Sequence, residues 1–230
     1  MRNAAAALVL SLLTVAAIPV LLVCVVFGLR DGFLAYGCWM MKVGRAILGI
    51  DLRVAGLDRL DRATPYVFMS NHLSFLDAPL LVTVIDRPVR FIAKRFVFRI
   101  PVLGPGMSFA GYVPLDKEGT GEGRKRIARA ADLIRARGYS FLVYPEGTRS
   151  PEGRLLPFRR GGFFLALDSG APIVPVSIAG TYELMPRGSR RVRKGTVRIV
   201  FHEPVPVEGF TEATMPELME RVRAAVASPR

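Results

Sequence analysis

The chain has 230 residues, which is enough for one sizeable domain and a small appendage, and 51% of them are hydrophobic. Its net charge of +13 indicates a polyanionic partner, such as nucleic acid, anionic lipid or a phosphorylated substrate. Two cysteines and two histidines argue against a disulfide framework and against a histidine-rich metal site.

The N-terminal segment is apolar. Residues 4–29 contain no charged side chain. This run exceeds the roughly 20 apolar residues that cross a bilayer, and it is longer than the apolar part of a signal peptide, about 7–15 residues. We therefore predict a membrane span at 4–29. Arg30, Lys42 and Arg45 outnumber Arg2 at its two ends, so the positive-inside rule places the rest of the chain on the cytoplasmic face of the inner or plasma membrane.

A second apolar stretch covers residues 32–50. Tyr36, Trp39, Lys42 and Arg45 are residue types that suit a membrane interface. Two interpretations stay open, an interfacial or re-entrant helix and the first helix of the following domain. We assign residues 1–50 to an N-terminal membrane anchor, made of one helix or a helical pair.

From residue 51 onward, short apolar runs alternate with charged, helix-like stretches. The predicted strands are 52–54, 66–69, 90–93, 112–115, 140–144, 173–178 and 196–201, and the predicted helices are 78–84, 124–137, 162–168 and 215–226. Residues 100–109 are rich in proline and glycine, which predicts turns. Pro114 cannot donate to a strand ladder, so its strand is expected at an edge. The alternation predicts an α/β domain over 51–230, with a mixed sheet flanked by helices.

The first candidate site follows the predicted strand 66–69. Asn71 and His72 come where this strand ends, and Asp77 comes where a helix is expected to begin. Strand ends in α/β folds are where sites are built. A carboxylate that binds one nitrogen of a histidine ring makes the other nitrogen a competent base. Asp77 could instead cap the helix, alone or in a capping box with Ser74, so a catalytic pair and a structural turn both remain open.

The second candidate site follows the predicted strand 140–144, in the turn Pro-Glu-Gly-Thr-Arg-Ser at 145–150. Arg149 offers a planar fork of donors that suits a phosphate group. The hydroxyl groups of Thr148 and Ser150 can add donors. The competing interpretation is an ordinary polar surface turn.

Two basic clusters contain no acidic residue. They are Arg87, Arg90, Lys94, Arg95 and Arg99, and Arg187, Arg190, Arg191, Arg193, Lys194 and Arg198. Each is a solvated face or, beside a membrane segment, a surface attracted to anionic lipid by about 1 kcal/mol per basic residue.

Together these features resemble the glycerolipid acyltransferase family, and within it the 1-acylglycerol-3-phosphate acyltransferases. Asn71-His72 followed by Asp77 is similar to the family's His-x-x-x-x-Asp motif, and residues 145–150 are similar to its glycerophosphate-binding motif. Val174-Pro175-Val176 resembles a later hydrophobic proline motif. A further block is matched by Lys94, Pro101, Gly104, Gly111 and Asp116-Lys117, although Phe96 and Lys117 stand where an acidic residue and an arginine are usual. The resemblance covers about residues 65–180.

The resemblance implies a reaction and a set of residues. His72 would take the proton from a glycerol hydroxyl, and Asp77 would orient His72. Arg149 and Lys117 would hold the acceptor's phosphate. The remaining implied substrate-binding residues are Asn71, Lys94, Glu146, Gly147 and Thr148. No metal and no tightly bound cofactor are implied.

The resemblance also implies partners. The donor would be an acyl thioester of coenzyme A or acyl carrier protein, the acceptor lysophosphatidate and the product phosphatidic acid. Anionic membrane lipid is an expected partner and nucleic acid is not. Two rivals remain, the same chemistry on another lysophospholipid or lyso-aminolipid, and a non-enzymatic basic protein that binds membranes or polyanions.

Overall fold

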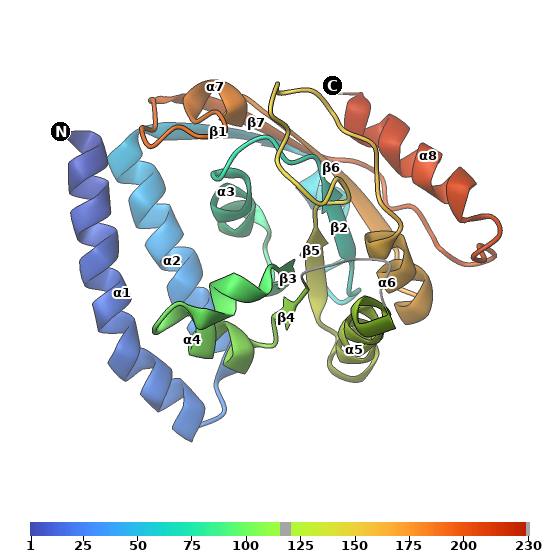
Figure 1. The fold of residues 1–230 in the computed structure, drawn as a ribbon, viewed down its shortest axis with the longest axis horizontal. Helices are drawn as coiled ribbons and strands as arrows, with labels where there is room; N and C mark the ends of the chain where they lie inside the picture. Colours follow the sequence, from blue (N-terminus) through green and yellow to red (C-terminus); the bar gives the residue numbers. More distant parts are fainter. Residues whose placement is uncertain (116–120, 229–230) are drawn as a thin grey trace.

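The computed structural model describes residues 1–115 and 121–228. Within these residues, seven strands form one sheet of order β1-β7-β6-β2-β5-β3-β4 (Figure 1). They are β1 (Ile50–Ala55), β2 (Val67–Ser70), β3 (Val89–Ala93), β4 (Val113–Pro114), β5 (Ser140–Val143), β6 (Ile173–Ala179) and β7 (Gly195–Phe201). Every pairing is parallel except that of β6 with β7. The predicted mixed sheet is confirmed, with β4 at its edge.

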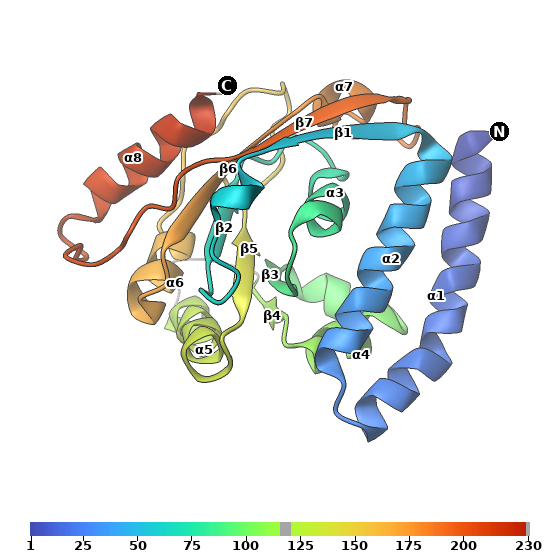
Figure 2. The ribbon, with the colours of Figure 1, turned by 180° about the vertical axis from the view of Figure 1, so that it is seen from behind.

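Helices cover both faces of this sheet. They are α1 (Arg2–Val26), α2 (Arg30–Leu48), α3 (Asp77–Val84), α4 (Leu103–Ala110), α5 (Gly121–Arg137), α6 (Gly161–Ser169), α7 (Thr181–Leu184) and α8 (Met215–Ala227), with 3₁₀ turns η1 (Leu57–Arg59) and η2 (Arg95–Arg99). Helices α5, α6 and α8 lie on one face, while α2, α3 and α4 lie on the other (Figures 1 and 2).

The buried residues of β2 show how the two layers form. Val67 and Met69 belong to the core cluster shared with α5, α6 and α8, whereas Phe68 belongs to the cluster shared with α3. Successive side chains of a strand point to opposite faces. A continuous apolar strand is therefore buried on both sides, as parallel strands between helical layers usually are.

Helix α4 corrects the prediction that residues 100–109 form turns. Its Pro105 lies in the first helical turn, where proline is tolerated because the missing N–H has no helical partner. Its Gly106 packs against α2 so closely that a Cβ atom there would lie 2.5 Å from the ring of Phe33. The glycine that suggested a turn instead permits this close helix contact.

Helices α1 and α2 form an antiparallel hairpin beside the sheet domain (Figures 1 and 2). Helix α1 is long and apolar enough to cross a membrane by length and composition. Its N-terminal end contacts the domain, because the Asn3 side chain donates to Val192 O (3.0 Å) and accepts from Val192 N (2.8 Å). A bilayer-crossing α1 that left residues 1–3 on the far side would have to give up both hydrogen bonds.

Helix α2 contacts the α/β domain directly. Cys38 Sγ donates to Val82 O of α3 at 3.2 Å, and Asp31 pairs with Arg90 of β3 at 2.5 Å. Of the two interpretations left open for residues 32–50, this packing agrees with a first domain helix. The division of the chain at residue 50 stays a prediction.

The first basic cluster is not a uniform solvated face. Arg90 is buried, and besides Asp31 its guanidinium stacks on Tyr139 at 3.3 Å. Arg87 pairs with Asp86, and Arg95 pairs with Glu122. The prediction that this cluster contacts anionic lipid is therefore wrong for Arg90, since its charge is used inside the fold.

Candidate active site

The motifs recognised in the sequence occupy four neighbouring parallel strands. The sheet order β6-β2-β5-β3 places the Val174–Val176 segment, the His72 turn, the 145–150 turn and Lys94 on successive strands. The carboxyl ends of parallel strands meet at one edge of a sheet, where α/β folds build their sites. The His72 turn, the 145–150 turn and Lys94 thus lie at the same edge, while Val174–Val176 lies within β6 beside Phe68–Ser70.

His72 and Asp77 form a hydrogen-bonded pair. Asp77 is fully buried, and its Oδ2 lies 2.7 Å from His72 Nδ1. Since a carboxylate only accepts, Nδ1 carries the hydrogen and Nε2 keeps its lone pair in the neutral ring. Nε2 has no hydrogen-bond partner within the described residues, and the side chain is 20% exposed. The pair therefore leaves one basic nitrogen open.

The same carboxylate builds the turn that holds His72. Asp77 Oδ2 also accepts from the N–H groups of Leu73 (2.7 Å) and Ser74 (2.8 Å). The bond from Ser74 N to Asp77 is the return bond of the predicted capping box, although Ser74 Oγ accepts from Leu76 N (3.3 Å) and not from Asp77 N. The catalytic and the structural interpretations are thus compatible, because one oxygen atom serves both.

The turn at 145–150 holds the main chain of His72. Glu146 is 2% exposed, and its Oε1 accepts from His72 N at 2.6 Å while its Oε2 accepts from Leu156 N at 2.8 Å. Ser150 N donates to His72 O at 2.8 Å. Burial raises the pKa of Glu146, and the hydrogen bonds that its carboxylate accepts from Leu156 N and His72 N oppose that shift. Glu146, which the resemblance assigned to substrate binding, therefore contacts His72 itself.

Tyr144 covers one face of the His72 ring. The ring centroids are 3.9 Å apart with an angle of 16° between the planes. Its hydroxyl oxygen is buried with no hydrogen-bond partner among the described residues. Burial raises the pKa of Tyr144 well above its usual value, and the charge of Asp77 raises it further. Tyr144 lies in none of the motifs recognised in the sequence. Its only signal is that its strand, β5, ends beside the strand that leads into His72.

Arg149 lies beside the His72 turn. Its guanidinium is 4.9 Å from the ring centroid of Phe75, which is 64% exposed. Arg149 has no acidic partner in the part of the chain that the structure describes, so its donors are open to an anion. Gly147 has φ +69°, a backbone conformation that favours glycine, and a Cβ atom there would displace the Arg159 side chain, which would lie 2.9 Å away.

The other predicted site residues differ in their positions. Asn71 is held by β6, because its Nδ2 donates to Ile178 O (2.9 Å) and its Oδ1 accepts from Ile178 N (2.8 Å). Thr148 lies half-buried in the turn, and Lys94 is exposed after β3. Lys117 lies outside the described residues.

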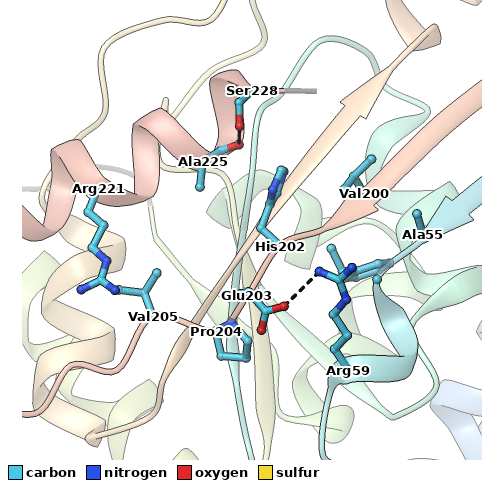
Figure 3. A pocket seen from close by; sticks show the side chains of 12 residues that line it. Ala55, Arg59, Val200, His202, Glu203, Pro204, Val205, Arg221, Ala225 and Ser228 are labelled. Carbon is cyan, nitrogen blue, oxygen red and sulfur yellow. Dashed lines mark hydrogen bonds and ion pairs between the residues drawn. The ribbon is translucent and has the colours of Figure 1, made fainter. Parts of the chain in front are cut away.

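A cavity of about 480 Å³ lies elsewhere, and no predicted site residue lines it (Figure 3). It follows the carboxyl ends of β1 and β7, which run opposite to β2 and β6. Arg59 and Glu203 form an ion pair of 2.9 Å at its rim. The cavity and the His72 turn therefore lie at opposite ends of the sheet's strands.

Known proteins match the region that carries this geometry. The model of the acyltransferase family matches residues 51–179, which is more than half of the chain. This chain belongs to the acyltransferase family. The family resemblance and the α/β fold expected from the sequence are both confirmed.

Two individual relatives of the chain are named as acyltransferases. The chain is 40% identical over 154 residues to a chloroplastic 1-acyl-sn-glycerol-3-phosphate acyltransferase of Brassica napus, covering 66% of this chain and 44% of the relative. It is 33% identical over 190 residues to 1-acyl-sn-glycerol-3-phosphate acyltransferase alpha of Homo sapiens, covering 80% and 67%. This acyltransferase chain thus spans less than half the length of the Brassica napus relative.

A solved structure extends the similarity to the N-terminal helices. The crystal structure of the 1-acyl-sn-glycerophosphate (LPA) acyltransferase of Thermotoga maritima matches with a TM-score of 0.77 at 28% identity. The match covers 99% of this chain and 95% of the other. The hairpin and the sheet domain therefore both fall within the matched fold.

Proposed function

We propose that this acyltransferase moves an acyl chain from a thioester to the free hydroxyl of 1-acylglycerol-3-phosphate, which gives phosphatidic acid. The observation that carries the proposal is the buried Asp77 bound to His72 Nδ1 at 2.7 Å, with Nε2 left open. The names of the relatives supply the acceptor class.

The chemistry requires no protein nucleophile. His72 Nε2 takes the proton of the acceptor hydroxyl as its oxygen attacks the thioester carbonyl carbon. The resulting imidazolium is stabilised by the Asp77 carboxylate. The tetrahedral intermediate then expels the thiolate, which takes the proton back from His72. The ester C–O bond forms, the C–S bond breaks, and His72 ends neutral. We expect no metal or tightly bound cofactor to take part.

Arg149 is the proposed contact for the acceptor phosphate. Its guanidinium lies beside Phe75, three residues after His72 in the same turn. A planar guanidinium can donate two parallel hydrogen bonds to one phosphate group. Binding the phosphate there would place the glycerol hydroxyl close to His72 and lower the entropic cost of the reaction.

Membrane contact is proposed for two parts of the chain. The outer surface of α1 is apolar and largely exposed. The second basic cluster is exposed, and all of it except Arg198 lies between α7 and β7, in the segment whose Val192 contacts the N-terminal end of α1. We propose that α1 attaches to the bilayer and that Arg190 and Arg191 contact anionic headgroups. If α1 crosses the bilayer, the positive-inside rule places the sheet domain on the cytoplasmic face.

One assay tests the reaction and its nearest rivals. Membranes containing the protein are given an acyl thioester with lysophosphatidate, with other lysophospholipids or with a lyso-aminolipid, and released thiol is measured. We expect thiol release with lysophosphatidate above all. Equal release with every acceptor would contradict the phosphate assignment, and no acceptor-dependent release would favour the non-enzymatic rival. Parallel reactions with acyl-coenzyme A and acyl carrier protein identify the donor.

A further inference from the structure

We propose that Tyr144 is a positioning residue whose ring holds the His72 imidazole in the plane that directs Nε2 at the acceptor hydroxyl. This inference rests on the function proposed above, because it assigns His72 as the base. Tyr144 is proposed to act through the His72 ring and not on either substrate.

The first argument is geometric. The bond from His72 Nδ1 to Asp77 fixes one point of the imidazole ring. The hydrogen bonds of Glu146 and Ser150 fix the main chain of His72, not its ring. With the main chain held, the ring still has two rotations, about its Cα–Cβ and Cβ–Cγ bonds, and one hydrogen-bond distance does not fix both. A second ring 3.9 Å away at an angle of 16° blocks tilting of the imidazole toward that side.

The second argument separates the ring of Tyr144 from its hydroxyl. The hydroxyl oxygen has no hydrogen-bond partner among the described residues, so it does not orient Asp77 or His72 through such a bond. Because burial and the Asp77 charge both raise its pKa, the phenol stays neutral. The planar face is then the part of Tyr144 that acts on His72.

The third argument concerns charge. His72 becomes an imidazolium during the proposed reaction, and the face of an aromatic ring attracts a cation. Tyr144 lies where this attraction grows as the proton moves to Nε2. An aliphatic side chain of similar size could fill the same space, but it would supply neither the flat surface nor this attraction.

The test compares Tyr144→Phe with Tyr144→Leu, using Tyr112→Leu as the matched control. Tyr112 is also a half-buried, stacked tyrosine, 5.4 Å from the ring of Phe91. We expect Tyr144→Phe to keep kcat within about twofold. Tyr144→Leu should lower kcat roughly 10- to 100-fold, the size expected for a small misplacement of a reacting group, with the KM of donor and acceptor unchanged. Tyr112→Leu should leave kcat unchanged.

A second measurement does not depend on turnover. The chain has only two histidines, so histidine labelled at ring Cε1 gives one ring signal for each, and His72→Ala assigns them. A ring stacked on Tyr144 should show an upfield ring-current shift, which Tyr144→Phe preserves and Tyr144→Leu removes.

The possible results are distinct. If Tyr144→Leu kept its kcat, or if Tyr144→Phe lost as much kcat as Tyr144→Leu, the proposal would be overturned. It would also be overturned if the His72 ring signal were the same in Tyr144→Leu as in the wild type. Failure of the wild type to acylate lysophosphatidate would instead refute the proposed function, while the ring-current shift would still report the stacking.

Discussion

Replacing Glu146 with glutamine is the most informative single change at the site. Glutamine has nearly the same shape but only one acceptor oxygen. In the wild type, the two carboxylate oxygens accept separately from His72 N (2.6 Å) and Leu156 N (2.8 Å). In Glu146→Gln, one of these N–H groups faces an NH₂ group, so one buried donor loses its partner.

The structure sets the expected size of the effect. An unsatisfied buried donor costs about 1–3 kcal/mol. Removing a buried charge relieves part of its desolvation cost, so the free energy of unfolding should fall by less than about 2 kcal/mol. The catalytic effect is larger, because a shift of His72 by about 1 Å costs roughly 100-fold in rate. We expect kcat to fall at least about 10-fold with the acceptor KM unchanged.

Steady-state kinetics with lysophosphatidate separates this role from substrate binding. Glu152→Gln is the matched control, because Glu152 is exposed in the same loop and its ion pair with Arg154 is 4.0 Å long. This control should behave as the wild type. An increase in acceptor KM with kcat intact in Glu146→Gln would refute the positioning role and would return Glu146 to the acceptor pocket.

The pH dependence of stability gives an independent check. Burial raises the pKa of Glu146 in the folded protein, so the folded state binds this proton more tightly than the unfolded chain does. The contribution of Glu146 to stability is therefore complete below the unfolded pKa and is lost as the pH rises through the folded pKa. The free energy of unfolding of the wild type minus that of Glu146→Gln, measured with denaturant, should fall from acid to neutral pH. A rise in this difference would contradict the assignment.

Three further changes have defined outcomes. Asp77→Asn should lower kcat by at least about 100-fold while circular dichroism stays unchanged, because His72 loses its charged partner; near-normal turnover would contradict the pairing. Arg149→Ala should lower kcat/KM for lysophosphatidate roughly 10- to 150-fold, with Arg154→Ala as a silent control; an equal loss on a phosphate-free acceptor would rule out phosphate binding. Arg190→Glu with Arg191→Glu should weaken binding to phosphatidylglycerol vesicles at least about 5-fold per residue, and an equal effect on neutral vesicles would exclude headgroup attraction.

The strands and their ends were predictable from the sequence. Apolar runs such as Val67–Ser70 and Ser140–Val143 are buried on both faces, and such runs read as strands without any knowledge of their neighbours. The polar residues directly after these two strands therefore meet at one edge of the sheet, as predicted. The hydrogen bond between His72 and Asp77 was also foreseeable, because it joins residues only five apart.

Contacts between distant segments were not predictable in the same way. Tyr144 stacks on His72 only because β5 lies next to β2, and nothing near Tyr144 in the sequence records that neighbour. Hydropathy describes the length of α1 but not the direction in which the chain returns, so the contact of Asn3 with Val192 was missed. Helix α4 was missed because its glycine and proline signal turns, although the fold uses that glycine for close packing.

The burial of individual charged residues was also not predictable from the sequence. Arg90 was assigned to a solvated or lipid-binding face because charged residues usually face solvent, and Glu146 was assigned to substrate binding by the family resemblance. In the fold, Arg90 pairs with Asp31 and Glu146 accepts from the main chain of His72. Each charge found its partner in a segment more than 50 residues away, and local patterns do not carry that information.

The most direct test follows both products of the proposed reaction in wild type and His72→Ala. Purified protein in lipid vesicles is given an acyl thioester and lysophosphatidate, and thiol and phosphatidic acid are measured together. We predict that the wild type releases one thiol for each phosphatidic acid formed, and that His72→Ala, inserted and folded to the same extent, forms almost none. If His72→Ala kept more than about a tenth of wild-type turnover, a general base worth 10²–10⁴-fold could not be its role, and the proposed mechanism would be wrong.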